Sequence, residues 1–338
     1  MNRFSYARAT DVQQAVAALG NASEASQAAA FIAGGTNLVD LLREHVARPS
    51  LLVDINRLPL KAIETTEAGG LRIGALVTNS TLAYDERIVQ RYPLLASAIL
   101  AGASAQIRNV ATVGGNLLQR TRCHYFYDAG TPCNKREPGT GCPALEGVNR
   151  IHAILGASEQ CIAVHPSDMC IALAVLDATV HLSGRDGART LPFADLHRLP
   201  GTTPHLDTNL HDDELVTAIE LPREGFAAHH AYVKVRDRAS YAFALVSAAI
   251  GVQLDGDTIR EARCALGGVA HKPWRDRDAE AMLRGARLTP QTVRDFAAAM
   301  VRDAHGRRQN AFKIELTIRT VVRAFEAATQ RSLGECMP

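Results

Sequence analysis

Four cysteines lie close together in a part of the chain that has little other pattern. Cys123, Cys133, Cys142 and Cys161 follow the spacing C-x9-C-x8-C-x18-C, in a segment over residues 119–156 that is rich in Gly and Pro. Thiolates are the usual ligands of iron–sulfur clusters, and metal binding could supply the folding energy that such a segment cannot gain from burial. Zinc also accepts four thiolates, although its ligands usually come in short C-x2-4-C pairs. Disulfides or free thiols are the plainest alternative.

The other three of the seven cysteines are not favoured as ligands. Cys170 lies on an apolar helix and Cys264 in a strand, where small buried thiols are common. Cys336 lies in the C-terminal tail. Disulfides are expected mainly in small secreted domains, so the local group of four thiols in this longer chain indicates metal first.

A glycine pair marks a sharp turn between a strand and a helix near the N-terminus. In FIAGGTNLVD (residues 31–40), Gly34 and Gly35 tolerate positive φ and let a ligand approach the backbone closely. The N–H groups that follow can bind an anion such as a diphosphate, and Thr36 and Asn37 can cap the helix or bond a phosphate oxygen. An ordinary turn without a ligand is the alternative, and the pattern is not the G-x-G-x-x-G of a Rossmann site.

Two further polar turns occur later in the chain. ATVGGNLL (residues 111–118) again places two glycines and an Asn after a β-branched strand. Two such turns could grip two parts of one long dinucleotide. In the third turn, HPSDM (residues 165–169), Asp168 could accept hydrogen bonds from ribityl or ribose hydroxyls, or simply cap the next helix.

The elements that must position these turns are predicted from hydrophobic spacing. Residues 11–19 and 37–45 are predicted as helices and residues 30–33 and 51–55 as strands, which gives a small α/β unit. A long helical stretch is predicted over residues 79–104, and alternation resumes at residues 161–164. Further strands are predicted near residues 62–65, 71–74, 178–182, 215–221, 231–236, 243–253 and 261–266, and further helices at 167–176, 277–283, 291–300 and 312–328.

We expect three parts in the chain, with boundaries at these elements. Residues 1–57 form the N-terminal α/β part and residues 58–225 a second part that contains the cysteine insertion at about residues 119–162. Residues 226–338 form an α+β C-terminal domain, because strands are followed there by helices.

Composition excludes several classes of protein. Hydrophobic residues make up 47% and charged residues 21%, which is typical of a globular protein and excludes disorder. Lys and Arg number 37 against 35 for Asp and Glu, so charge gives no reason to expect nucleic acid or a membrane. We expect a soluble protein with no signal peptide or membrane span, whose partners are small molecules and other proteins.

Four motifs together resemble the FAD-binding subunits of molybdenum hydroxylases, which include xanthine dehydrogenases, carbon monoxide dehydrogenases and aldehyde oxidoreductases. The motifs are AGGTN (33–37), ATVGGN (111–116), PSD (166–168) and LGGVAHKPWR (266–275), and the similarity covers essentially the whole chain. The resemblance implies a vanillyl-alcohol-oxidase-like two-part FAD-binding domain, followed by a CO-dehydrogenase-flavoprotein-type C-terminal α+β domain.

The resemblance also implies which residues bind FAD. Lys234 would lie beside the flavin ring, where a cation stabilises negative charge, although the strand pattern by itself predicts a solvated lysine. Val216 would lie near the ring, Asp168 would bind hydroxyls, and the first two turns would hold the diphosphate and the sugar-like chain. The full predicted set is Ala33, Gly34, Gly35, Thr36, Asn37, Leu38, Thr112, Gly115, Asn116, Asp168, Val216 and Lys234.

The cysteine segment is most similar to the form found in aldehyde oxidoreductases. That similarity implies one 4Fe-4S cluster held by Cys123, Cys133, Cys142 and Cys161. The implied function is that of an oxidoreductase subunit in a heterotrimer, with a molybdenum-cofactor large subunit and a 2Fe-2S small subunit. Electrons would pass to FAD and on to oxygen, a quinone, a ferredoxin or NAD. A xanthine dehydrogenase-type or hydroxybenzoyl-CoA reductase-type complex is the alternative.

No catalytic acid, base or nucleophile is expected in this chain, because substrate oxidation would occur on the partner subunit. The chain would be periplasmic if it is exported with a signal-bearing partner, and cytoplasmic otherwise. Three other classes compete: a nicotinamide dehydrogenase, which would need a Rossmann fingerprint, a zinc-stapled scaffold without redox work, and a stand-alone FAD oxidase.

Overall fold

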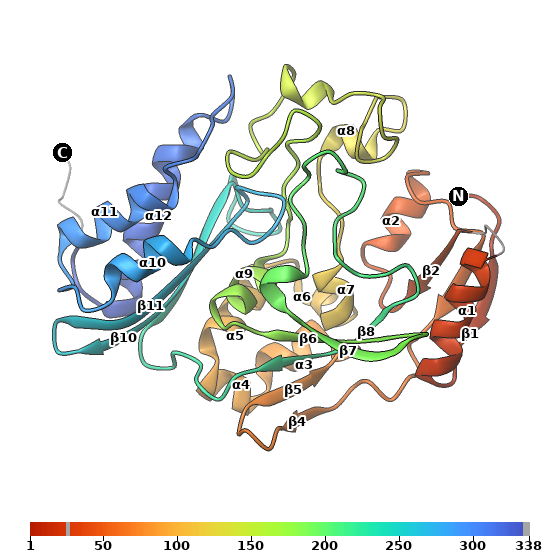
Figure 1. Cartoon of the computed structure of the whole chain (residues 1–338), viewed down its shortest axis with the longest axis horizontal. Coiled ribbons are helices and arrows are strands. Elements are labelled where there is room, and N and C mark those ends of the chain that lie inside the picture. The colour runs from red at the N-terminus through yellow and green to blue at the C-terminus, as the bar shows by residue number, and fades with distance from the viewer. Residues whose placement is uncertain (25–27, 334–338) are drawn as a thin grey trace.

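The N-terminal part of the chain forms a small parallel sheet with helices packed on it (Figure 1). The computed structural model describes residues 1–24 and 28–333, so Cys336 lies outside the described residues. Strands β1 (Ser5–Arg8), β3 (Leu51–Asp54) and β2 (Ala29–Ile32) pair in that order, and both pairings are parallel. Helix α1 (Val12–Glu24) connects β1 to β2, and α2 (Leu38–Arg43) connects β2 to β3, as parallel strands require. The predicted α/β unit is confirmed.

Strand β1 is missing from the sequence prediction. It lies at the edge of its sheet, and its side chains are exposed or half-buried, so no alternation marks it. Tyr6 and Arg8 of this strand both bond the carboxylate of Asp54 at the end of β3. Pairing with a strand more than 40 residues away, rather than a local pattern, therefore defines β1.

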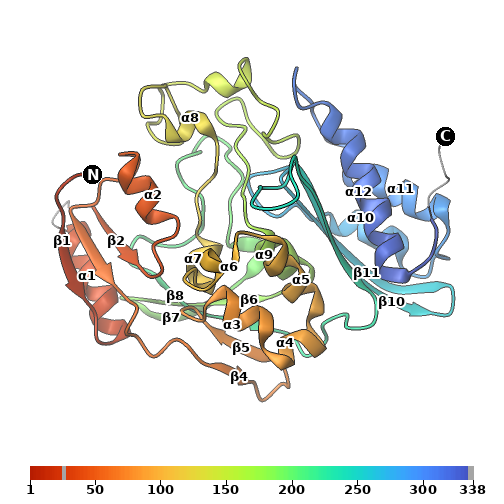
Figure 2. The same ribbon diagram turned by 180° about the vertical axis from the view of Figure 1, so that it is seen from behind.

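The central sheet has five antiparallel strands in the order β4-β5-β8-β6-β7. Strand β8 lies between β5 and β6. The chain around Val216 is therefore placed beside β5, which comes much earlier in the sequence. Figure 2 shows the helices that follow β5 on the near face of this sheet. The strands are β4 (Ile63–Thr65), β5 (Leu71–Gly74), β6 (Thr179–Gly184), β7 (Gly187–Pro192) and β8 (Leu215–Leu221).

The long helix predicted over residues 79–104 is wrong, because the segment contains three short helices. These are α3 (Asn79–Tyr84), α4 (Glu86–Arg91) and α5 (Pro93–Ala101). Asp85 leaves the helical region with ψ of 127°, and its carboxylate caps α4 by accepting from the Arg87 N–H at 3.0 Å. Pro93 has no N–H to continue a helix and begins α5 at its first position. Ser104 then caps a further short helix, α6 (Ala105–Arg108).

The C-terminal part is an antiparallel three-stranded sheet covered by helices, as predicted. The strands pair in the order β11 (Thr258–Gly267), β10 (Val246–Asp255) and β9 (His230–Val235). Helices α10 (Arg277–Leu283), α11 (Pro290–Met300) and α12 (Phe312–Thr329) pack together, with the rings of Phe296 and Phe325 5.6 Å apart. Across the described residues, no helix is both long enough and apolar enough to cross a bilayer.

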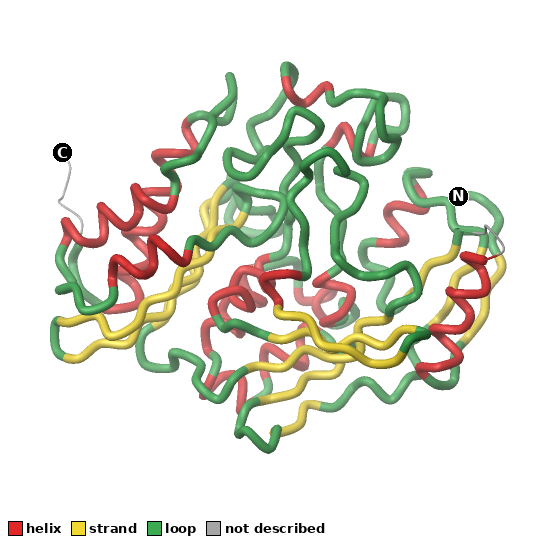
Figure 3. The backbone as a smooth tube through the Cα atoms, in the orientation of Figure 1, coloured by secondary structure: helices red, strands yellow, loops and turns green. Residues whose placement is uncertain are grey.

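The cysteine segment is ordered mainly as loops, which Figure 3 shows in green. Between α7 (Val113–Leu117) and α9 (Asp168–Val175) it contains only α8 (His124–Tyr127) and the short turn of helix η1 (Pro143–Leu145). The alternation at residues 161–164 does not produce a strand. Cys161 makes an isolated bridge to Ser158, and Ile162 accepts from the Ala153 N–H within the same segment. Local pairing therefore replaces the sheet there.

Lys313 of α12 connects that helix to the cysteine segment through hydrogen bonds. Its side chain is fully buried, and Nζ donates to the carbonyl oxygens of His152 at 2.8 Å and Gly268 at 2.5 Å. Burial, together with repulsion from Arg150, lowers the pKa of Lys313 from 10.5 to about 7. A neutral amine still has two N–H groups, which is enough for both carbonyls.

Stability should therefore depend on pH through Lys313. Between pH 7 and 10.5 the unfolded chain binds a proton that the folded chain does not, so the unfolding free energy should rise with pH across this window. Lys313→Met should remove that slope and cost about 1–3 kcal/mol for each carbonyl left unpaired. Thermal unfolding at pH 7 and pH 9 measures both effects, with the exposed Lys61→Met as control. Equal pH slopes in wild type and Lys313→Met would contradict this account.

Candidate functional site

The first glycine turn packs against the backbone just before the second. A Cβ on Gly34 would lie 2.0 Å from the carbonyl oxygen of Val110, and Gly35 has φ of +70°. No larger residue fits either position without movement or strain of the backbone. Gly34 is thus required by the close approach of two chain segments and Gly35 by its positive φ, at the point where a dinucleotide was predicted to bind.

Asn37 does not cap α2, so that part of the prediction is wrong. It makes no side-chain cap bond. Its Oδ1 instead accepts from the backbone N–H of Arg120 at 2.8 Å, and its Nδ2 donates to the Tyr127 hydroxyl at 3.3 Å. Asn37 therefore joins the first turn to the start of the cysteine segment. The two residues are more than 80 positions apart in the sequence, so no local pattern predicts this contact.

The second and third turns are bonded to each other. Thr112 caps α7 by accepting from the Gly115 N–H at 3.3 Å. The hydroxyl of Ser167 donates to Asn116 Oδ1 at 2.5 Å and accepts from the Cys170 N–H, so Ser167 rather than Asp168 caps α9. The carboxylate of Asp168 is left free for another role.

Asp168 forms a buried pair with Lys234, so the solvated lysine that the strand pattern predicts is wrong. Lys234 Nζ lies 2.8 Å from Asp168 Oδ2 and also donates to the Ala101 carbonyl at 3.1 Å. Only 4% of the Lys234 side chain and 10% of the Asp168 side chain are exposed. The hydroxyl of Tyr232 donates to Asp168 Oδ1 at 2.5 Å, and burial raises the pKa of Tyr232, so the phenol stays protonated. Tyr232 was not predicted from the sequence.

Breaking this pair should be costly. Lys234→Met leaves the buried Asp168 carboxylate with a hydrogen bond from the Tyr232 hydroxyl and no cation beside it, and losing one member of a buried ion pair typically costs about 3–5 kcal/mol. We expect a lower unfolding temperature and weaker flavin retention, measured by thermal unfolding and by flavin released per chain. The exposed Lys61→Met serves as control. A Lys234→Met protein as stable as wild type would show that the Asp168–Lys234 ion pair does not stabilise the fold.

A cavity of about 740 Å³ runs between these turns. This volume lies within the usual range for cofactor sites, about 300–1,000 Å³. Arg108, Tyr241 and Phe243 also line the cavity, although no sequence pattern pointed to them. Every predicted cofactor residue lines it: Ala33, Gly34, Gly35, Thr36, Asn37, Leu38, Thr112, Gly115, Asn116, Asp168, Val216 and Lys234. Five separate segments of the chain are thus brought to one cavity.

The four predicted metal ligands also meet. Cys123, Cys133, Cys142 and Cys161 all line one small cavity, and all four are free thiols. The Cys161 thiol hydrogen-bonds to Cys142 and lowers the pKa of Cys142 to about 6, whereas burial raises the pKa of Cys123 to about 11. Cys170 and Cys264 are buried and lie outside this group, as predicted.

Two buried histidines contact this group, and the sequence did not identify either of them. His152 Nε2 lies 3.1 Å from Cys123 Sγ, and His271 Nε2 lies 3.3 Å from Cys161 Sγ. Burial lowers the pKa of His152 to about 4 and of His271 to about 3, so both rings are neutral near pH 7. Each ring can therefore present one N–H to sulfur, and such bonds help set the potential of an iron–sulfur centre.

The cavity and the thiols are neighbours. A further cavity, of about 250 Å³, is lined by Cys123 and His152 from the cysteine group and by Ser167 and Asp168 from the third turn. The hydrogen bond from Asn37 of the first turn to the Tyr127 hydroxyl also links the large cavity to the cysteine segment. A cavity large enough for a dinucleotide therefore lies beside a group of four free thiols, an arrangement that suits an electron carrier.

Comparison of the chain with known protein families shows the family to which it belongs. The family described as FAD binding domain in molybdopterin dehydrogenase matches residues 2–224, and that described as CO dehydrogenase flavoprotein C-terminal domain matches residues 230–328. The chain belongs to the family of FAD-binding medium subunits of molybdenum hydroxylases.

Similar proteins carry names of the same kind. The aldehyde oxidoreductase FAD-binding subunit PaoB of Escherichia coli K12 is 50% identical, over 95% of this chain and 96% of the relative. The glyceraldehyde dehydrogenase medium chain of Sulfolobus acidocaldarius is 30% identical, over 87% and 86%. A solved structure of carbon monoxide dehydrogenase from Hydrogenophaga pseudoflava covers 97% of this chain and 98% of its own, with a TM-score of 0.74 and 28% identity. The predicted fold class is thereby confirmed.

Proposed function

We propose that this chain is the FAD-carrying electron-transfer subunit of a molybdenum-containing aldehyde oxidoreductase complex. The observation that carries the proposal is the convergence of three turns and the Asp168–Lys234 pair on one cavity, beside four free cysteines. The 50% identity to the E. coli aldehyde oxidoreductase subunit over nearly the whole chain supports the aldehyde substrate class.

The residues of this chain hold and orient the cofactors. Bound FAD would accept single electrons from iron–sulfur centres and discharge them to an external acceptor. Backbone N–H groups of the two glycine turns would hold the diphosphate, with Thr112 and Asn116 beside the sugar-like chain. Asp168 would accept hydrogen bonds from hydroxyls, and Lys234, anchored by Asp168, would place a positive charge beside the ring, near Val216.

The cysteine group would hold a 4Fe-4S cluster through Cys123, Cys133, Cys142 and Cys161. Zinc also accepts four thiolates, but its ligands usually come in short C-x2-4-C pairs, and the spacing C-x9-C-x8-C-x18-C contains none. This spacing favours a cluster over a single zinc ion.

The complex would be a heterotrimer with a molybdenum-cofactor large subunit and a 2Fe-2S small subunit, and export with a signal-bearing partner would make it periplasmic. The acceptor would be oxygen, a quinone, a ferredoxin or NAD. A xanthine dehydrogenase-type complex is the second candidate, because the xanthine dehydrogenase FAD-binding subunit of E. coli O157:H7 is 27% identical over 88% of this chain.

The test is reconstitution with the two partner subunits. The isolated, FAD-loaded chain should not oxidise aldehydes with an artificial acceptor, whereas the assembled complex should, with its FAD bleaching when aldehyde is added without acceptor. Turnover of aldehyde by the isolated chain would refute the subunit assignment. A complex that turns over xanthine and not aldehydes would refute the substrate class alone.

A further inference from the structure

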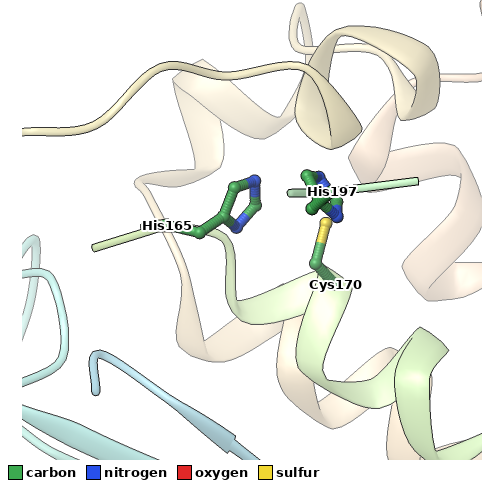
Figure 4. A group of neighbouring side chains, drawn as sticks. All are labelled: His165, Cys170 and His197. Carbon is green, nitrogen blue, oxygen red and sulfur yellow. The ribbon is translucent and has the colours of Figure 1, made fainter. Parts of the chain in front are cut away.

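A second group of metal-ligating side chains lies outside the cysteine segment. His165 comes from the third turn, Cys170 from the first turns of α9, and His197 from the loop after the short helix η2 (Phe193–Asp195). One ligand atom from each lies within 4.8 Å of the other two. Figure 4 shows the Cys170 sulfur beside a ring nitrogen of His197. Their exposed fractions are 8%, 0% and 3%, so water does not compete freely for these donors.

Both imidazole rings are oriented by one backbone carbonyl. His197 Nε2 lies 2.8 Å from the Leu117 oxygen, and His165 Nε2 lies 3.4 Å from the same oxygen. An Nε2–H that donates to a carbonyl leaves the lone pair on Nδ1, which is the arrangement that orients metal-binding histidines. Burial lowers the pKa of both rings, to about 4 for His197, so the lone pairs are available near pH 7.

The two Nδ1 atoms are poorly satisfied in the protein itself. His197 Nδ1 is buried without a hydrogen-bond partner, and His165 Nδ1 accepts from the Ser167 N–H at the long distance of 3.4 Å. A buried acceptor without a partner typically costs about 1–3 kcal/mol. A ligand between the rings and the thiol would remove that cost.

We propose that His165, Cys170 and His197 bind one zinc ion through the two Nδ1 atoms and the Cys170 thiolate. Two imidazole nitrogens and one sulfur suit a borderline-soft ion such as Zn²⁺ and do not suit Mg²⁺ or Ca²⁺. Binding displaces the Cys170 proton, which leaves to solvent, and a water would take the fourth tetrahedral position. Zn–N of about 2.0–2.1 Å and Zn–S of about 2.3 Å require the donors to move closer to one another by at most about 1.5 Å.

A zinc ion at this site would cross-link two segments of the chain, one of which is the third turn of the cofactor cavity. His165 precedes Asp168 by three residues, and Ser167 between them bonds Asn116 of the second turn. An ion shared with His197 would fix the third turn to the connection between β7 and β8 of the central sheet. The proposal does not depend on the cysteine segment or on the assignment of the substrate.

The test is the zinc content and zinc coordination of the full-length, FAD-loaded chain, purified without chelators and incubated with excess zinc before desalting. We expect about one tightly held zinc per chain, with X-ray absorption showing two nitrogens at about 2.0–2.1 Å and one sulfur at about 2.3 Å. Cys170→Ala should lower the zinc content at least tenfold. Cys264→Ala, which removes another buried free thiol, should leave it unchanged. If Cys170→Ala does not fold, His197→Gln replaces it.

Three results would overturn the proposal. Wild type without bound zinc would do so, as would zinc that persists in folded Cys170→Ala and His197→Gln. Zinc surrounded by four sulfurs would place the ion in the cysteine segment, which would overturn both this site and the 4Fe-4S assignment. In that last case flavin content and reconstituted turnover would be unaffected, so failure here is distinguishable from failure of the FAD-subunit function.

Discussion

Gly34→Ala is expected to remove most of the bound FAD. The new Cβ would lie 2.0 Å from the Val110 carbonyl oxygen, far inside van der Waals contact, and the obstacle is backbone rather than a mobile side chain. One of the two turns must therefore move by about 1 Å, and both line the cofactor cavity. Amide groups that hold a diphosphate depend on their exact placement, so we expect at least a tenfold fall in FAD affinity, or about 1.4 kcal/mol or more.

The measurement is FAD released on denaturation per folded chain, after desalting. Gly130→Ala is the matched control, because Gly130 is exposed, has no positive φ, and its Cβ would meet only the flexible end of Asp128 at 3.2 Å. Gly130→Ala should retain FAD. Normal FAD content in Gly34→Ala, at an unchanged unfolding temperature, would contradict the assignment of the first turn to the cofactor.

Cys133→Ser is expected to abolish the iron signal while leaving FAD largely bound. The cluster needs four thiolates, and a serine hydroxyl at Cys133 does not replace a soft, readily deprotonated ligand. Cys133 lines the cysteine cavity and does not line the 740 Å³ cavity, so the flavin site should survive the change. The segment should lose stability, because metal binding contributes to its folding.

Iron and acid-labile sulfide, measured per FAD in anaerobically purified protein, give the result. Cys264→Ser is the control, since Cys264 is a buried thiol of β11 outside the group. Its iron content should match wild type. Unchanged iron in Cys133→Ser would remove Cys133 from the ligand set.

Features that the sequence encodes locally could be predicted. The first turn is a strand, a glycine pair and a helix within residues 31–40, and each step has its own signal. The same holds for β8 and α10, whose predicted and observed bounds agree. The break of residues 79–104 into three helices also had a local signal, in Pro93 and Asp85, but the apolar spacing of the whole stretch outweighed it.

Contacts between distant segments could not be predicted. Lys234 looks like a solvated strand residue until Asp168, 66 residues earlier, is placed beside it. His271 meets Cys161 across 110 residues, and β1 is defined only by its pairing with β3. In each case the three-dimensional fold supplies a partner that the neighbouring sequence does not specify. The resemblance to a family placed Lys234 at the cofactor, whereas its own sequence context did not.

Anaerobic purification of the chain, followed by a visible spectrum and by flavin, iron and zinc analysis, tests the central claim most directly. The account predicts a flavin spectrum with a broad iron–sulfur contribution, about one FAD and about four iron atoms per chain. A correctly folded chain that contains no flavin, and takes up none when FAD is added, would contradict it.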